Sequence, residues 1–335
     1  MADDSAQPKK ILILHSGGIG DLLLALPALR IFRRNFPEAI LELMGHPERL
    51  SPVAFDLRAE SIHSIDQGGM NFFYLRGEPL PSRLAAFFSS FEIALLFEKT
   101  ESILSENLRR AGVDQVISVP SFPPEGSKIH ASDYLIESLK SRGLKGGDSF
   151  LPLRLPTDAL AFAGCFWAKF GRQEGEKVLA IHPGSGSPAK NWAPQNFARV
   201  ADWVSERSRV LLISGPAEDG AAEIRLAMKK ESPLVADNLP LINLAALIKT
   251  STAYLGNDSG ITHLAALCGI PTVAIFGPTD PTVWGPRGPE VQIIYGGKVP
   301  SPGLAAKGNK DPCFWWNRVQ LDSVMEALAP FFKMK

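Results

Sequence analysis

Cysteine is scarce in this 335-residue sequence, and neither charge sign is in excess. The three cysteines, Cys165, Cys268 and Cys313, are far apart and odd in number, which fits neither a disulfide framework nor a zinc-binding spacing. We therefore expect free thiols. The 35 basic residues balance the 35 acidic ones, so charge gives no reason to expect binding to nucleic acid.

Long apolar runs are also missing. No stretch approaches the roughly 20 residues that cross a bilayer, and the first ten residues are polar, without the apolar core of a signal peptide. These absences predict a cytoplasmic protein. The length exceeds that of one ordinary core and suits two domains of roughly 150 residues each.

Short apolar runs alternate with amphipathic stretches along the whole chain. This alternation predicts an α/β fold with doubly wound, Rossmann-like parallel sheets. The predicted strands cover 11–14, 40–43, 61–65, 93–97, 116–119, 178–181, 210–214, 252–255, 272–276 and 291–295. The pattern loosens between residues 151 and 175, where we place the domain boundary.

The clearest motif is LGNDSGITHLAALCGIPTVAIFGPTDP, residues 255–281. A polar turn joins a predicted strand to a predicted helix, which Gly269 ends before a second strand. Asp258 or Ser259 can cap the helix, and Gly260 keeps its first turn free of a side chain. Several backbone N–H groups are then available to a ligand, which predicts an anion site.

A second polar loop, HPGSGSPAKNW at residues 182–192, also follows a predicted strand. Small residues allow the backbone to approach a diphosphate, and Lys190 adds positive charge. The loop is not a Walker motif, because the sequence contains no G-K-[ST]. A surface loop with a solvated lysine is an equally good interpretation of this segment alone.

The loop HSGGIGD, residues 15–21, follows the first predicted strand. It matches a dinucleotide fingerprint only weakly, because Leu23 stands where the third glycine belongs. Asp21 has two interpretations. It can be an ordinary helix N-cap, or a reactive carboxylate in the crevice where open α/β sheets bind ligands.

Together these segments resemble glycosyltransferase family 9, the ADP-heptose:lipopolysaccharide heptosyltransferases. Gly20 and Asp21, the Lys190–Trp192 segment and residues 255–281 stand in the register of that family's motifs. The resemblance implies a GT-B architecture, in which two Rossmann-like domains face each other across a cleft. It also implies inverting transfer of a heptose from ADP-heptose to a hydroxyl of the lipopolysaccharide inner core.

The resemblance assigns roles to domains and residues. Residues 1–172 would bind the acceptor, residues 173–318 the donor, and residues 319–335 would form a helix that packs back on the first domain. Asp21 would be the general base, and Gly18 and Gly20 would belong to the acceptor loop. The nucleotide-sugar donor would be bound by Ser185, Ser187, Lys190, Glu218, Asp258, Ser259, Gly260 and His263.

The implied acceptor is a lipid-linked oligosaccharide, which suggests peripheral contact with the cytoplasmic face of the inner membrane. Residues 67–81 could form an acceptor loop, and Arg30, Arg33 and Arg34 could meet anionic groups. An ordinary surface loop and a solvated helix face are the alternatives. Likewise, Glu218 could merely favour a helix dipole, and His263 could be a packed core residue.

Some features depart from the family pattern. Asn243 replaces the usual acid of the helix beside the adenine, and the loop 296–317 contains one cysteine where many relatives have several. A cluster-type metal site is therefore not expected. Because no Asp-x-Asp pair occurs, we expect neither a metal nor another cofactor.

Alternative functions remain open at this point. The chain could use another nucleotide sugar or a glycan acceptor outside lipopolysaccharide. A sugar-nucleotide epimerase on the same scaffold would need further acid and base groups. A non-catalytic nucleotide-sugar binding protein would have no use for Gly20 and Asp21.

Overall fold

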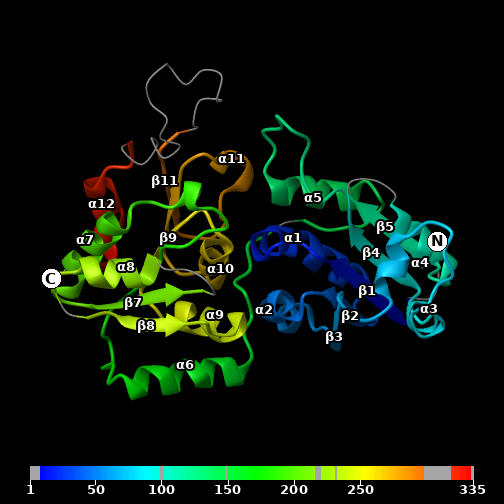
Figure 1. Ribbon diagram of the computed structural model, residues 1–335, viewed down its shortest axis with the longest axis horizontal. Coiled ribbons are helices and arrows are strands. Elements are labelled where there is room, and N and C mark those ends of the chain that lie inside the picture. The colour runs from blue at the N-terminus through cyan, green and yellow to red at the C-terminus, as the bar shows by residue number, and fades with distance from the viewer. Residues whose placement is uncertain are drawn as a thin grey trace. The chain divides into compact units, whose positions relative to one another are not determined.

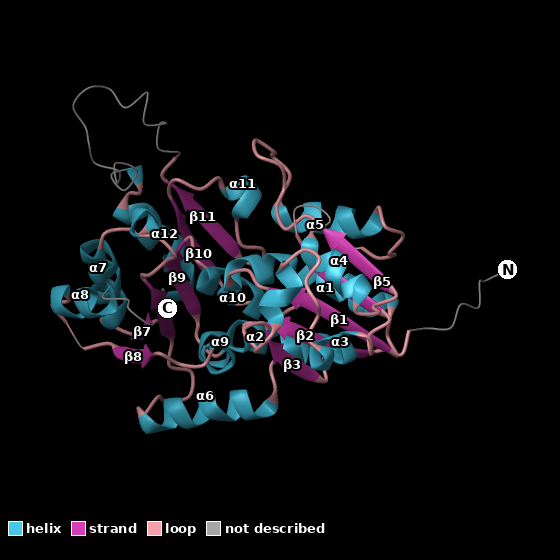
Figure 2. Ribbon diagram, turned by 45° about the vertical axis from the view of Figure 1, so that its right-hand side comes forward, coloured by secondary structure: helices cyan, strands magenta, loops and turns pink. Residues whose placement is uncertain are grey.

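The computed structural model describes residues 8–98, 102–147, 149–215, 220–230, 232–297 and 318–332. The chain divides into two compact units, residues 1–149 and 150–335 (Figure 1). Each unit contains one parallel sheet with helices on both faces (Figure 2). The predicted α/β fold with doubly wound parallel sheets is confirmed.

Unit 1 has a five-stranded sheet in the order β3-β2-β1-β4-β5. The inner strands read as continuous apolar runs because helices cover both of their faces. The strands are β1 (Lys10–His15), β2 (Ile40–Gly45), β3 (Ser61–Ser64), β4 (Ile93–Phe97) and β5 (Gln115–Val119). The helices are α1 (Ile19–Asn35), α2 (Pro47–Leu57), η1 (Met70–Tyr74), α3 (Ser82–Phe88), α4 (Ile103–Arg110) and α5 (Ala131–Lys140).

Gly45 shows how closely two strand ends approach in this sheet. It is the last residue of β2 and pairs with His15, the last residue of β1. A Cβ at position 45 would lie 2.1 Å from the carbonyl oxygen of His15, so only glycine fits there. The carboxyl end of β1 is thereby held in a fixed place.

Unit 2 has a six-stranded sheet in the order β11-β10-β9-β6-β7-β8. Its strands are β6 (Val178–His182), β7 (Arg209–Ser214), β8 (Leu234–Asp237), β9 (Ala253–Asn257), β10 (Thr272–Phe276) and β11 (Val291–Tyr295). Its helices are α6 (Thr157–Lys169), η2 (Pro188–Lys190), α7 (Pro194–Ser205), α8 (Gly220–Ala227), α9 (Leu241–Lys249), α10 (Gly260–Cys268), α11 (Pro281–Trp284) and α12 (Leu321–Phe332).

The domain boundary differs from the one expected from the sequence. The division falls after residue 149, earlier than the predicted 172, because α6 packs against α9 and belongs to unit 2. Trp167 of α6 donates a hydrogen bond from Nε1 to Oγ1 of Thr250, at 2.8 Å.

The last helix packs against elements of unit 2. α12 lies against α7, β10 and β11, and its apolar side chains Val324, Leu328 and Phe332 are part of the core of unit 2. These contacts lie within unit 2, and the expectation that the helix packs back on the first domain stays a prediction. None of the helices in the described ranges is both long and apolar enough to cross a membrane.

Candidate functional site

Both sheets reverse their strand order once, between β1 and β4 in unit 1 and between β6 and β9 in unit 2. Ligands of open α/β sheets bind at such switch points, outside the carboxyl ends of the strands. The loops singled out in the sequence follow β1, β6 and β9. The structure therefore places these three loops at the two switch points.

The start of α10 forms one wall of the site in unit 2. Ser259 is the N-cap, and its Oγ accepts a hydrogen bond from the N–H of Thr262 at 3.4 Å. The same Oγ lies 3.3 Å from Nδ1 of the buried His182, at the end of β6. Gly260 opens the helix without a side chain, so an anion can approach the positive end of the helix dipole, although the N–H of Thr262 is taken up by the cap.

Asn257 ties the loop after β6 to the end of β9. It is fully buried, donates from Nδ2 to the carbonyl oxygen of Pro183 at 2.6 Å, and accepts from the backbone N–H of Trp192 at 3.0 Å. The sequence analysis missed this residue as part of the site. Its only signal was an amide side chain at the end of a buried strand.

Lys190 and Asp258 meet at this switch point. Nζ of Lys190 lies 2.8 Å from Oδ2 of Asp258, and the side chains are 33% and 7% exposed. Oδ2 is buried, and its contact with the ammonium group is an ion pair without the alignment of a hydrogen bond. Two residues that were predicted separately thus form one charged centre.

Ser185 and Ser187 shape the loop that delivers Lys190. The Ser185 hydroxyl donates to the carbonyl oxygen of Ser187 at 2.7 Å and lies 2.6 Å from Oδ1 of Asn191. It also accepts the N–H of Ser187 at 3.2 Å. In this structure the two predicted serines fold the loop and thereby fix the position of the lysine.

The two remaining predicted donor-binding residues of unit 2 are His263 and Glu218. His263 lies in the first turn of α10 and is only 6% exposed, which agrees with the alternative of a packed residue. Glu218 lies outside the described residues. Its predicted contact with a donor ribose stays a prediction.

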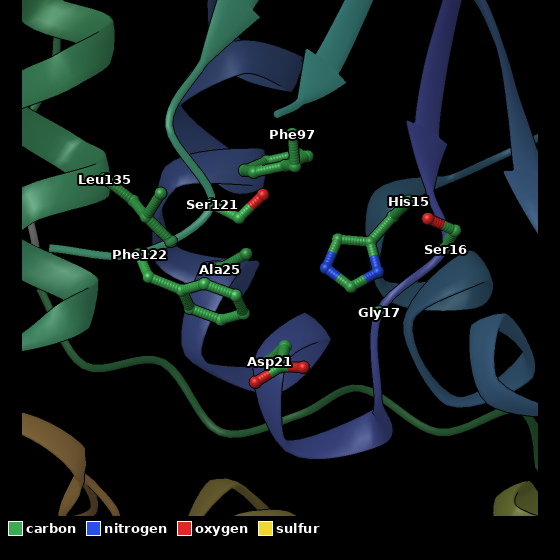
Figure 3. Close-up of a pocket in the computed structure, with 9 residues that line it drawn as sticks. All are labelled: His15, Ser16, Gly17, Asp21, Ala25, Phe97, Ser121, Phe122 and Leu135. Atoms are coloured by element: carbon green, nitrogen blue, oxygen red, sulfur yellow. The ribbon is translucent and has the colours of Figure 1, made fainter. Parts of the chain in front are cut away.

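A cavity of about 200 Å³ opens at the switch point of unit 1 (Figure 3). Asp21 lies on its wall in the first turn of α1, and its Oδ2 accepts the N–H of Gly18 at 3.0 Å. Asp21 is thus not the N-cap itself; from the third helical position its carboxylate bonds back to the N-cap residue and also faces the cavity. Gly18 is the N-cap, and Gly20 is part of the helix itself. The lining residues are His15, Ser16, Gly17, Asp21, Ala25, Phe97, Ser121, Phe122 and Leu135.

His15 is a lining residue that the sequence analysis did not single out. It ends β1, is 6% exposed, and its ring packs edge-on against Phe97 with centroids 5.3 Å apart. Burial lowers the pKa of His15 to about 4; a backbone hydrogen bond opposes this shift, and the charge of Arg49 adds to it. The imidazole is therefore neutral near pH 7.

The arginine cluster on α1 is engaged within unit 1. Arg30 forms a bidentate ion pair with the buried Asp56, at 2.7 and 2.8 Å. Arg33 donates to the carbonyl oxygens of Phe36 and Ala39. The arginines thus contribute to folding, and the interpretation of Arg30 and Arg33 as ligands for anionic groups loses its support.

The cysteines and possible metal ligands were also located. Among the described residues, no three His, Cys, Asp or Glu side chains group as metal ligands. Cys165 is exposed and Cys268 is buried, and both are free thiols. Burial raises the pKa of the Cys268 thiol to about 12. Cys313 lies outside the described residues.

Comparison with known proteins gives three kinds of likeness. Residues 157–310 match the family model of glycosyltransferase family 9 (heptosyltransferase). Lipooligosaccharide heptosyltransferase 2 of Haemophilus influenzae is 32% identical over 137 residues, which cover 38% of this chain and 40% of that protein. Lipopolysaccharide heptosyltransferase 2 of Escherichia coli K12 is 22% identical over 327 residues, 85% of this chain and 87% of that protein.

A solved structure extends the likeness to the fold of the chain. The crystal structure of a family 9 glycosyl transferase from Veillonella parvula superposes with a TM-score of 0.79 at 18% identity, covering 97% of each chain. At this identity the likeness concerns the fold. The motifs matched in sequence lie in the unit that contains Lys190 and Asp258.

Proposed function

Because this chain belongs to glycosyltransferase family 9, we propose that it transfers a heptose from ADP-heptose to a hydroxyl of the lipopolysaccharide inner core, with inversion at the anomeric carbon. Relatives named as heptosyltransferases support the proposed sugar and acceptor. The proposed setting is the cytoplasm, with peripheral contact at the membrane surface that carries the lipid-linked acceptor.

The observation that carries the proposal is the charged centre of unit 2. Lys190 and Asp258 meet beside the open first turn of α10, at the switch point between β6 and β9. A diphosphate would be held by the ammonium group of Lys190 and by N–H groups of the helix. The carboxylate of Asp258 would accept hydrogen bonds from hydroxyl groups of the transferred sugar.

In the proposed reaction, the acceptor oxygen attacks the anomeric carbon as the bond from that carbon to the diphosphate oxygen breaks. The hydroxyl proton passes to the carboxylate of Asp21, and ADP leaves with the electron pair of the broken bond. Lys190 and the first turn of α10 stabilise the growing negative charge on the diphosphate. The single displacement inverts the anomeric configuration.

The cavity of unit 1 favours a transferase over a binding protein. A protein that only stored nucleotide sugars would need the site of unit 2 and would have no use for a carboxylate at the first switch point. Asp21 lines a cavity in addition to capping α1. This second role is the one that a transfer reaction requires.

The proposal is tested by incubating the full chain with ADP-heptose and heptose-deficient lipopolysaccharide. We expect release of ADP together with a mass increase of one heptose on the acceptor. Thermal-shift measurements with ADP-, UDP- and GDP-sugars should show the largest stabilisation with the ADP-sugar. Stabilisation by UDP- or GDP-sugars alone, with no transfer from ADP-heptose, would contradict the proposal.

A further inference from the structure

His15 and Asp21 share the cavity at the carboxyl end of β1. Figure 3 shows the imidazole of His15 beside the open space and the carboxylate of Asp21 below it, with the rings of Phe97 and Phe122 on the other sides. A Cβ added to Gly17 would lie 3.0 Å from Cε1 of His15 and 3.2 Å from Oδ2 of Asp21. Glycine at position 17 therefore leaves room for a ligand atom that can approach both groups.

We infer that His15 positions the acceptor hydroxyl for Asp21, by hydrogen-bonding the sugar that occupies this cavity. The inference rests on the proposed glycosyl transfer. It assigns to His15 the orientation of the nucleophile and leaves proton removal to Asp21. His15 is thus a positioning residue, and the ligand it recognises is a polyhydroxylated sugar ring.

The chemistry of the cavity wall suits such a ring. Phe97 and Phe122 offer apolar surfaces to the C–H groups of a sugar, while His15, Ser121 and Asp21 offer polar groups to its hydroxyls. An imidazole in its neutral form has one N–H donor and one acceptor nitrogen. One ring nitrogen makes the backbone hydrogen bond, and the other can bond to a hydroxyl of the sugar, so the neutral imidazole can orient the sugar without removing a proton.

The environment of His15 keeps the ring in the required state. The preceding residues of β1, Ile11 to Leu14, are buried, and the positive charge of Arg49 acts on the ring. Burial and this positive charge both disfavour a protonated ring. The ring is therefore held in its neutral form at the wall of the cavity.

During transfer, the bond between the acceptor oxygen and the anomeric carbon forms while the bond to the diphosphate breaks. The proton moves from the acceptor oxygen to Asp21, and ADP departs with the bonding electrons. His15 neither gains nor loses a proton. Its contribution is the angle and distance at which the oxygen approaches, and small displacements of a nucleophile can cost roughly 10²-fold in rate.

The test compares His15→Leu and His15→Gln with wild type, using ADP-heptose and heptose-deficient lipopolysaccharide as probes. His63→Gln is the matched control, since His63 also packs edge-on against a phenylalanine of unit 1 but contacts Glu42 and does not line the cavity. The readouts are kcat and KM for the acceptor, KM for ADP-heptose, acceptor-free hydrolysis of ADP-heptose, and Tm.

We expect His15→Leu to lower kcat/KM for the acceptor by roughly 10- to 100-fold, with hydrolysis of ADP-heptose and its KM within about twofold of wild type. His15→Gln, whose amide both donates and accepts, should recover transfer to within about fivefold of wild type. If His15→Leu does not fold, His15→Asn replaces it, because its shorter amide keeps polarity but loses reach.

Near-normal transfer by the Leu variant, or equal loss of transfer and hydrolysis, would overturn the inference. So would a well-folded Gln variant that is as slow as the Leu variant. In each of these cases, the proposed function is still supported if the wild-type chain hydrolyses ADP-heptose and transfers heptose to the acceptor. A wild-type chain that does neither reaction would overturn the proposed function and the inference together.

Discussion

Replacing Lys190 by alanine tests the charged centre of unit 2. Among the described residues, Lys190 is the residue that forms an ion pair with the buried carboxylate of Asp258. Its Nζ lies 2.8 Å from Oδ2 of Asp258. The substitution removes a charge-assisted contact to phosphate, which contributes about 1.5–3 kcal/mol. This corresponds to a loss of roughly 10- to 150-fold in affinity for ADP.

The neighbouring carboxylate makes the effect larger than that of one lost contact. In Lys190→Ala, the charge of Asp258 is uncompensated and repels the diphosphate. Asp258→Asn in the same background removes this repulsion, so the double variant should bind ADP more tightly than Lys190→Ala. The single Asp258→Asn variant should bind ADP at least as well as wild type, because the ammonium group of Lys190 then interacts with the diphosphate without a competing carboxylate.

The assay is titration calorimetry with ADP and with adenosine, at fixed salt. Lys190→Ala should weaken ADP far more than adenosine, because adenosine has no phosphate. Lys249→Ala is the control: Lys249 donates to the carbonyl oxygen of Cys268, at the opposite end of α10, and should leave both affinities unchanged. Equal losses for ADP and adenosine, or strictly additive effects of the two substitutions, would refute the reasoning.

Three further predictions concern pH, packing and metals. His15 takes up a proton near pH 4 in the folded chain and near pH 6.5 in the unfolded chain. The free energy of unfolding should therefore be highest above pH 6.5 and should fall by about 3 kcal/mol as the pH is lowered to 4. Tm against pH should fall less steeply in His15→Gln. Gly45→Ala should lower stability by about 1–3 kcal/mol through the clash with His15, whereas Gly68→Ala, with open space around it, should change Tm little. Because no Asp-x-Asp pair occurs, saturating chelator should leave most transfer activity in place, and strict dependence on Mg²⁺ would contradict this.

Most of the fold was predictable because parallel strands buried on both faces give continuous apolar runs. The predictions at 93–97, 272–276 and 291–295 match β4, β10 and β11. β8 was missed because this short edge strand is mostly half-exposed and has no such run. The packing of α6 and α12 was not predictable, since an amphipathic pattern tells which helix face is buried but not which unit buries it.

The site was predictable as separate pieces. The Gly-rich turn at α10 and the lysine loop were visible because their residue types suit an anion. Their union depends on β6 and β9 being neighbours, which follows from sheet order and not from local sequence. His15 and Asn257 were missed because a polar residue at the end of a buried strand gives no signal of its own until the loops around it are placed.

The most direct test of the account is the transfer rate of Asp21→Asn. Asparagine keeps the size and capping ability of aspartate and removes its affinity for a proton. If Asp21 is the general base, the variant should keep its Tm and bind ADP within a few-fold of wild type, while transfer of heptose falls by roughly 10² or more. Transfer at a near-normal rate would reduce Asp21 to the cap that its hydrogen bond with Gly18 describes, and would contradict the proposed mechanism.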